Sequence, residues 1–361
     1  MLFSIEPKSR REDLYDFNHE LEMLMRFLRS SRLTLVTGLR RTGKTSLLKV
    51  ALNEAGIDYV YVDVRLSLYA SYRDVIDLFI QALNELLRRR SSIRDKIINA
   101  LRGIEGLRIS VNPPEISVRF RGKPRVSVAD LLIRLNEVGG PVIIAIDEAQ
   151  ELRRVNWLRF DRLFAYIFDN LPNIRLALSG SQVGLLYDFL GLHDPKAPLF
   201  GRAYVEVKTR KLSPDESLDF LERGFNQLGI NCPKNVLERA VETFDGIIGW
   251  LTYFGYTYSM RRSADFDEIM KDAVQLALNE LRNLVSSLRS VRYAVILRVL
   301  AREPMPWRLI KRRLEDYEGR EINAATVSEL LGNLVDLGIV EKADDYYRIS
   351  DPVYRLAAEY L

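Results

Sequence analysis

The chain has 361 residues, of which 47% are hydrophobic and 28% are charged, so it is long enough for two or three domains with hydrophobic cores. Its net charge of +4 is too small to indicate a nucleic-acid partner by itself, and one cysteine with two histidines excludes an intramolecular disulfide and argues against a zinc site. No stretch approaches the ~20 apolar residues of a membrane span, so we expect a cytoplasmic protein with no targeting segment and no membrane contact.

Apolar residues recur at helical spacing between residues 11 and 30, which predicts a helix that Asn18 could cap. An apolar, β-branched run follows and leads into a glycine-punctuated segment, so that residues 33–46 read LTLVTGLRRTGKTS. This stretch fits G-x-x-x-x-G-K-[ST] at every fixed position, between a predicted strand and an amphipathic helix. We interpret it as a phosphate-binding loop; a plain turn is the alternative.

The physical reason for this pattern is that glycines let successive backbone N–H groups face one point, at which the next helix also aims its positive end. Lys44 would reach the β- and γ-phosphates, and the Thr45 hydroxyl would bind Mg²⁺. The first helix would lie beside the nucleotide, as an adenine pocket or as simple packing. The residues predicted to bind the nucleotide are Phe17, Asn18, Gly38, Leu39, Arg40, Arg41, Thr42, Gly43, Lys44, Thr45 and Ser46.

The next part of the chain is predicted to alternate between strands and helices. Residues 59–64 predict a buried strand, and residues 72–90 predict a helix. Residues 88–125 are dense in basic side chains and contain two alternating runs, which predict a β-hairpin inserted at about 105–122. The hairpin either packs on the domain or contacts a partner. A helix over 128–138 then ends at a Gly-Gly-Pro sequence.

The second chemical signal is PVIIAIDEAQ at residues 141–150, a short β-branched run that ends in two adjacent carboxylates. At the carboxyl end of a buried strand, Asp147 would face Mg²⁺ through water, and Glu148 would point at the attacking water. The two acids could instead only cap the next helix. Because the phosphate loop and this acidic pair occur in one chain, we favour the catalytic interpretation.

Two further strands complete the predicted sheet. Residues 174–178 precede Ser179 and Ser181, whose hydroxyls could hold the water or the γ-phosphate, although serines in this place also form turns. Arg202 stands before a strand at 204–207 and could stabilise transition-state charge at its own γ-phosphate or at a neighbouring subunit's. A surface arginine is the alternative.

The sequence from residue 211 onward is predicted to be helical at first. Ser213 and Glu216 match a capping box, with Pro214 at the first helical position. The helices of this predicted bundle span about 214–228, 233–244, 248–261 and 266–287.

The last residues predict a winged helix, because three helices are followed by two short strands. The expected elements are helices at 291–300, at 306–317 and after Asn323, and strands at 339–342 and 346–349. Such domains bind DNA through the third helix. Here the second helix is the basic one, the exposed part of the third is not basic, and the wing tip is acidic, which weakens a groove-binding interpretation. The basic residues are Arg308, Lys311, Arg312 and Arg313.

Nearly the whole chain resembles the archaeal AAA+-type ATPases, and within them the STAND-related family, which is similar in layout to archaeal origin-recognition initiators. The most specific motifs are Gly38–Thr45 and Ile146–Glu148, supported by Ser179–Ser181, Leu199–Arg202 and Asp351-Pro352. Where relatives usually carry Gly-x-Pro in the helical bundle, this chain has the sequence GIIGW at residues 246–250. Relatives usually carry Arg-Glu in the early helix, where this chain has His19-Glu20.

The resemblance implies a five-stranded parallel sheet and ATP as the nucleotide. It also implies that Lys44 binds phosphates, Thr45 and Asp147 hold Mg²⁺, and Glu148 polarises water. Ser179 or Ser181 would sense the γ-phosphate, and Arg202 would be the arginine finger.

We therefore expect an α/β P-loop ATPase domain at 1–210, a helical lid at 211–288 and a winged-helix domain at 289–361. The predicted function is a switch that hydrolyses ATP to ADP and acts on duplex DNA or a protein partner, with self-association as a further option. A module that keeps ADP bound without hydrolysis is the alternative, and a DNA-binding regulator is a third.

Overall fold

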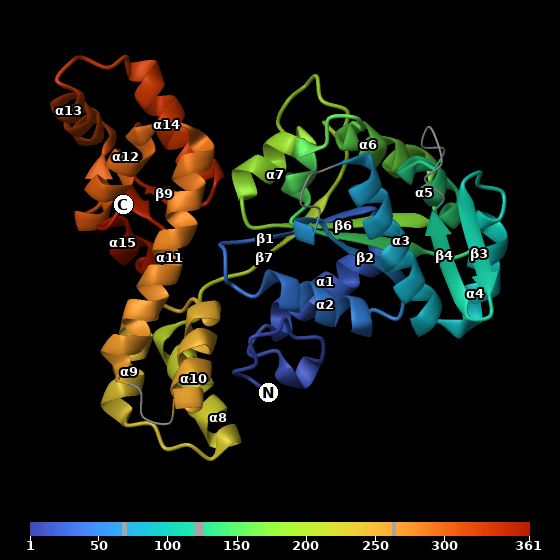
Figure 1. Cartoon of the computed structure of the whole chain (residues 1–361), viewed down its shortest axis with the longest axis horizontal. Coiled ribbons are helices and arrows are strands. Elements are labelled where there is room, and N and C mark those ends of the chain that lie inside the picture. Colours follow the sequence, from blue (N-terminus) through green and yellow to red (C-terminus); the bar gives the residue numbers. More distant parts are fainter. Residues whose placement is uncertain (67–70, 119–125, 262–264) are drawn as a thin grey trace.

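The computed structural model describes residues 1–66, 71–118, 126–261 and 265–361. Figure 1 shows a sheet flanked by helices, formed by the chain up to about residue 210, beside a column of helices that ends at the C-terminus. In the described residues no helix is long and apolar enough to cross a membrane.

The central sheet has five parallel strands in the order β2-β5-β6-β1-β7, which confirms the predicted α/β fold. The inner strand β5 is buried along its whole length, because its apolar residues face helices on both sides of the sheet. The strands are β1 (Leu33–Thr37), β2 (Asp58–Asp63), β5 (Val142–Asp147), β6 (Ile174–Gly180) and β7 (Val205–Lys208).

Helices cover both faces of this sheet and enclose two separate hydrophobic clusters. The helices are α1 (Asn18–Ser30), α2 (Lys44–Glu54), α3 (Tyr72–Arg89), α5 (Val128–Asn136), α6 (Phe160–Asn170) and α7 (Val183–Leu190). The sequence analysis did not predict α6 and α7. The capping role predicted for Asn18 is wrong, because Phe17 occupies the cap position with its ring buried and Asn18 is the first helical residue.

A β-hairpin is present where the sequence predicts one, although residues 119–122 of the predicted range lie outside the described residues. Its strands β3 (Leu107–Val111) and β4 (Pro114–Val118) pair antiparallel. The Asn84 amide of α3 accepts from the Ile116 N–H at 2.7 Å and donates to the Ile116 carbonyl at 2.8 Å. The hairpin therefore packs on the domain, beside a helix that the sequence analysis missed, α4 (Ser91–Leu101).

Four helices follow the sheet: α8 (Pro214–Leu228), α9 (Lys234–Phe244), α10 (Ile248–Arg261) and α11 (Phe266–Leu288). The predicted capping box is confirmed, since the Ser213 hydroxyl accepts from the Glu216 N–H and the Glu216 carboxylate accepts from the Ser213 N–H. These two bonds satisfy backbone donors that the start of α8 would otherwise leave unpaired.

The winged helix is also confirmed, with Asn323 capping its third helix by accepting from the Ala325 N–H at 2.8 Å. A short first strand and a C-terminal helix were not predicted. The elements are α12 (Val291–Arg302), β8 (Met305–Pro306), α13 (Trp307–Glu318), α14 (Ala324–Asp336), β9 (Val340–Ala343), β10 (Tyr346–Ile349) and α15 (Pro352–Ala358).

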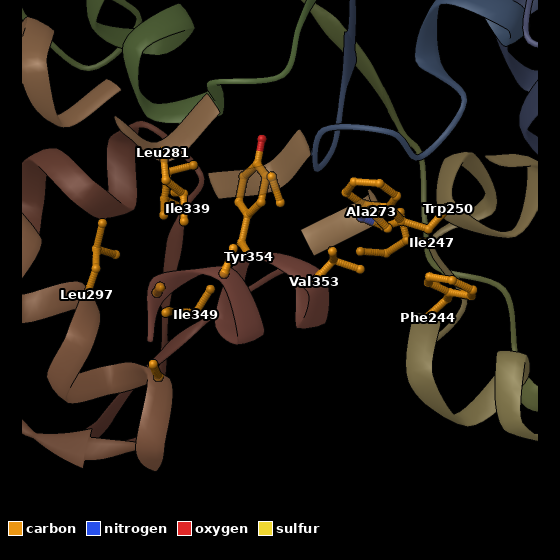
Figure 2. Close-up of a cluster of buried hydrophobic side chains, with 14 of the residues drawn as sticks. Phe244, Ile247, Trp250, Ala273, Leu281, Leu297, Ile339, Ile349, Val353 and Tyr354 are labelled. Atoms are coloured by element: carbon orange, nitrogen blue, oxygen red, sulfur yellow. The ribbon is translucent and has the colours of Figure 1, made fainter. Parts of the chain in front are cut away.

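One continuous hydrophobic cluster joins the helical bundle to the winged helix. In Figure 2, Trp250 and Ala273 of the bundle lie toward one end of this cluster, Leu297 and Ile349 of the winged helix lie toward the other, and Val353 lies between. A domain boundary at 288 stays a prediction, because the side chains on its two sides share this core.

The first residues of the chain are anchored by a single buried ring. Phe3 lies edge-on to Phe225 at 4.9 Å and to Phe220 at 5.6 Å between ring centres. A Cβ added at Gly224 or at Gly255 would lie 2.2 or 2.5 Å from this ring, so the two glycines make the space for it in α8 and α10.

We expect Phe3→Ala to lower the free energy of unfolding by about 3 kcal/mol, because it leaves a cavity between two helices. Urea unfolding followed by circular dichroism measures this change. Ile5→Ala is the matched control, since Ile5 is exposed and its loss should change stability by less than about 0.5 kcal/mol. Equal effects of the two substitutions would contradict the anchoring role of Phe3.

Candidate functional site

The phosphate loop curls tightly between β1 and α2. Gly38 and Gly43 have φ angles of +140° and +88°, which side chains with a Cβ rarely adopt. The Thr42 hydroxyl donates to the Leu39 carbonyl at 2.7 Å and lies 2.6 Å from the Thr209 hydroxyl, which ties the loop to the end of β7. The backbone shape needed to enclose a phosphate is therefore present in the protein itself.

Lys44 is the buried cation of this loop. Its ammonium group donates to the Leu39 carbonyl at 2.5 Å. Burial lowers the pKa of Lys44 to about 8, although the nearby carboxylates of Glu148 and Asp147 act in the opposite direction. A triphosphate would supply the negative charge that a buried ammonium needs.

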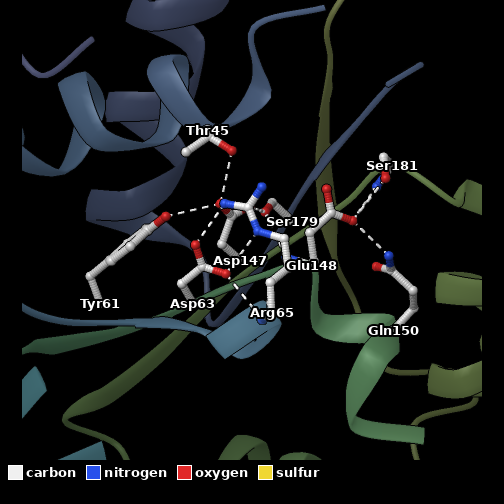
Figure 3. A network of polar contacts seen from close by, with 9 residues as sticks. All are labelled: Thr45, Tyr61, Asp63, Arg65, Asp147, Glu148, Gln150, Ser179 and Ser181. Carbon is white, nitrogen blue, oxygen red and sulfur yellow. Dashed lines mark hydrogen bonds and ion pairs between the residues drawn. The ribbon is translucent and has the colours of Figure 1, made fainter. Parts of the chain in front are cut away.

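Asp147 is fully buried at the end of β5 and accepts hydrogen bonds from several neighbouring elements (Figure 3). Its Oδ2 accepts from the Thr45 hydroxyl at 2.8 Å and from the Tyr61 hydroxyl at 2.9 Å, and its Oδ1 accepts from the Ser179 hydroxyl. The Thr45 hydroxyl and the Asp147 carboxylate are the hard oxygen ligands that Mg²⁺ prefers. The residues present therefore fit a magnesium ion at this point.

Glu148 has a left-handed backbone with φ +54°, which turns its side chain away from the line of β5. Its Oε2 accepts from the Gln150 amide at 2.6 Å, and from the Ser181 N–H and hydroxyl at 3.1 and 2.8 Å. Burial alone would raise the pKa of Glu148, but the Lys44 charge and these hydrogen bonds lower it below its usual range. The carboxylate is thus ionised at neutral pH.

The two candidate serines have different positions. Ser179 is buried behind Asp147, whereas Ser181 lies beside Glu148 at the wall of the cavity. Of the two, Ser181 is therefore the one that can meet a ligand in this arrangement.

A cavity of about 590 Å³ opens in front of the loop, between the sheet and the helical bundle. Loop and acidic residues form one wall, and the first residues of the chain together with α8 and α10 form the other. The apolar part of this lining includes Leu2, Ile5, Pro7, Tyr15, Phe220, Ile248 and Tyr253.

The candidate adenine residues do not line this cavity. Phe17 is buried in the core behind the loop, with its ring 3.6 Å from where a Cβ of Gly43 would lie. Asn18 accepts from Arg11 at 3.5 Å at the surface. The N-terminal residues Leu2, Ile5 and Pro7 line the cavity instead.

Arg202 is also far from the loop within its own chain. Its guanidinium pairs with Asp169 at 3.0 and 2.5 Å. It precedes β7, whose first residue Val205 is level with Thr34 at the start of β1, whereas the loop follows the end of β1. Since β1 and β7 are parallel, Arg202 and the loop lie toward opposite ends of the sheet.

The loop contacts the helical bundle directly, which the sequence analysis did not anticipate. The Arg41 guanidinium binds the Glu280 carboxylate of α11 at 3.0 and 2.8 Å and lies 4.0 Å from the centre of the Trp250 ring. The Gly249 N–H of α10 donates to the Arg41 carbonyl at 2.9 Å. The Trp250 indole in turn donates to Asp351 at the start of α15, at 2.8 Å.

The parallel sheet, the glycine-rich loop and the hydroxyl–carboxylate pair together define a P-loop ATPase domain that is followed by helices and a winged helix. The chain belongs to the family of ATPase domains found predominantly in Archaea, whose model matches residues 14–254. A second model, of the C-terminal winged helix-turn-helix domain of MCM proteins, matches residues 287–350.

Among solved structures, a Walker-type ATPase of Pyrococcus abyssi is 34% identical, with 99% of each chain covered and a TM-score of 0.82. The RuvB Holliday junction branch migration motor of Thermotoga maritima is 12% identical over 98% of each chain, with a TM-score of 0.44. AMPPCP-bound DnaA of Aquifex aeolicus is 14% identical over 92% of each chain, with a TM-score of 0.40. The last two similarities are too weak to carry an argument. No curated protein matches the chain.

We expect Ser179→Ala to lower the free energy of unfolding by about 1–3 kcal/mol, because it leaves a buried carboxylate oxygen of Asp147 without its donor. Urea unfolding in EDTA measures the change without nucleotide or metal. Ser181→Ala removes a hydroxyl at the cavity wall and should lower the free energy of unfolding by a smaller amount. A smaller loss for Ser179→Ala than for Ser181→Ala would contradict the assignment of the two serines.

Proposed function

We propose that the chain is an ATP-hydrolysing switch, in which the state of the nucleotide is transmitted to the winged helix. The observation that carries the proposal is the contact of Arg41 with Glu280 of α11 and with the Tyr354 hydroxyl of α15, because one residue of the phosphate loop binds both the helical bundle and the C-terminal helix. A ligand that alters the loop must also alter this contact. Such differential contacts are what couples a binding site to a distant conformational change.

The chemical roles follow from the site. Lys44 and the loop N–H groups bind the phosphates, and Thr45 and Asp147 hold Mg²⁺, which supplies positive charge at the phosphates when bound. Glu148 is an ionised carboxylate at the cavity wall and acts as the base that orients the attacking water. Ser181 lies beside it and contacts the γ-phosphate, while Ser179 fixes the orientation of Asp147.

Arg202 serves a different subunit in this proposal. Its position toward the opposite end of the sheet suits a contact with a neighbouring copy's nucleotide rather than with its own. Its pairing with Asp169 would then be exchanged for a phosphate when copies associate.

The winged helix provides the output, to duplex DNA or to a protein. Its third helix α14 is close to the ATPase domain: a Cβ at Gly184 would lie 2.6 Å from the Asp336 Cα, and one at Gly338 would lie 3.1 Å from the Ser181 carbonyl. On the second helix, Arg308, Arg312 and Arg313 are exposed and available to an acidic partner. Release of α14 from the ATPase domain would expose further surface.

A module that retains ADP is the second candidate. The observation that favours it is that Glu148 is held by Gln150 and Ser181, so this carboxylate must exchange partners before it can activate water. A site in this arrangement could bind a nucleotide without turning it over.

Steady-state phosphate release from ATP, with and without duplex DNA, separates the two candidates. For the switch we expect turnover that falls by at least about a hundredfold in Lys44→Ala and Glu148→Gln, while Glu148→Gln still binds ATP. Glu238→Gln, a surface carboxylate of α9, is the control and should leave turnover unchanged. Tightly bound ADP without multiple turnover would overturn the switch in favour of the module.

We expect Glu280→Gln to lower the free energy of unfolding by about 2 kcal/mol at pH 7, because Arg41 remains largely buried without its carboxylate. Burial raises the pKa of Glu280, but the guanidinium of Arg41 and the charge of Arg40 lower it below its ordinary 4.5. The ionised pair therefore stabilises the fold above pH 4.5, and this contribution disappears as the pH falls through the depressed pKa. Unfolding curves from pH 3 to 7 should show wild type and variant converging in acid. A constant difference would count against the ion pair.

A further inference from the structure

A second arginine, Arg65, lies at the edge of the sheet that faces the phosphate loop (Figure 3). It follows β2 in a short 3₁₀ turn, Val64–Leu66. The last residue of β2, Asp63, is paired in register with Asp147 at the end of β5. Arg65 is therefore level with the carboxylate that holds Mg²⁺ in the proposed function.

The guanidinium of Arg65 is fixed before any ligand binds. Its Nε and Nη2 donate to the Asp63 carboxylate at 2.9 and 2.6 Å, and Nη2 lies 3.5 Å from Asp147 Oδ2. Its Nη1 makes no hydrogen bond with the residues that the structure describes. Half of the side chain is exposed, and Arg65 lines the cavity together with Lys44, Thr45 and Glu148.

The charge arrangement around Arg65 indicates what it binds. Lys44 and Arg65 are two cations that line one cavity. Two such cations are stabilised by a ligand with several negative charges. The planar guanidinium matches the oxygens of a phosphate, and a pre-oriented side chain loses little entropy on binding one.

Arg202 and Arg40 are less suited to this task within one chain. Arg202 lies toward the other end of the sheet, and Arg40 lies in the loop itself with its guanidinium 3.7 Å from Glu280, on the side of the helical bundle. Arg65 instead lies on the side of Asp147 and Thr45, where the end of the triphosphate and its metal would lie.

We propose that Arg65 contacts the γ-phosphate of ATP from within the same chain and stabilises the charge that develops during hydrolysis. This inference rests on the proposed function and adds a catalytic residue to it. The guanidinium stays protonated throughout and contributes hydrogen bonds and charge only. We also expect the site to bind ATP and ADP with different affinities when no metal ion is present.

The first test is binding by calorimetry in EDTA, with ATP and ADP as the ligands and the full chain as the protein. We expect Arg65→Gln to weaken ATP binding by at least about tenfold and ADP binding by less than twofold, because only ATP carries the γ-phosphate. Arg65→Lys should recover part of the ATP affinity through its charge.

The matched control is Arg159→Gln. Arg159 pairs with the carboxylate two residues away, Asp161, at 3.0 and 2.7 Å, as Arg65 pairs with Asp63, but it lies outside this cavity. Arg159→Gln should leave the affinities for ATP and for ADP unchanged. A loss of ATP affinity in Arg159→Gln equal to that in Arg65→Gln would contradict a specific contact.

The second test is steady-state turnover with Mg²⁺. Arg65→Gln should lower kcat on the order of 10³-fold, the range seen when an arginine that contacts the transferring phosphoryl group is lost. An unchanged kcat and an unchanged ratio of ATP to ADP affinity would overturn the inference. Equal losses of ATP and ADP affinity would also overturn it, since they indicate a structural role. If the wild type does not turn over ATP, the hydrolytic function fails, but the affinity ratio still decides whether Arg65 binds the γ-phosphate.

Discussion

The contact between Arg41 and Glu280 is the interaction on which the arrangement of the whole chain depends. A guanidinium with only 18% of its side chain exposed needs a carboxylate partner, and α11 supplies the one that it binds. The same guanidinium lies over the Trp250 ring, and Trp250 is hydrogen-bonded to Asp351. The ion pair and the ring contact together hold the phosphate loop, the helical bundle and the C-terminal helix in one position.

The loop, the acidic pair and most of the elements could be predicted because their signals are local. Gly38 and Gly43 stand at a fixed spacing because both positions have a positive φ angle. Ser213 caps α8 by accepting a hydrogen bond from the N–H of Glu216, three residues later. The Arg41–Glu280 pair spans 239 positions and has no such pattern. The position of the N-terminal segment could not be predicted for the same reason. The two glycines that make room for the Phe3 ring are more than 200 residues away in the sequence.

The two arginines show what the topology of the sheet adds to an argument from sequence order. Arg202 follows the loop and the acids in the order expected of an arginine finger, but β7 is parallel to β1 and begins at the other end of the sheet. Arg65 stands in an unremarkable sequence after β2, yet β2 pairs with β5 and ends beside Asp147. In a parallel sheet, the residues that follow the strands meet at one edge, whatever their order along the chain.

The first turn of α10 contacts the phosphate loop at Gly249. The Gly249 N–H donates to the Arg41 carbonyl, a bond that a proline nitrogen could not make. A Cβ at this position would lie 2.9 Å from the same carbonyl oxygen, so the close approach also requires glycine. The first turn of α10 therefore binds the loop through its backbone, and the adjacent Trp250 carries the contact to α15. A displacement of the loop relative to α10 would break both the N–H bond and the ring contact.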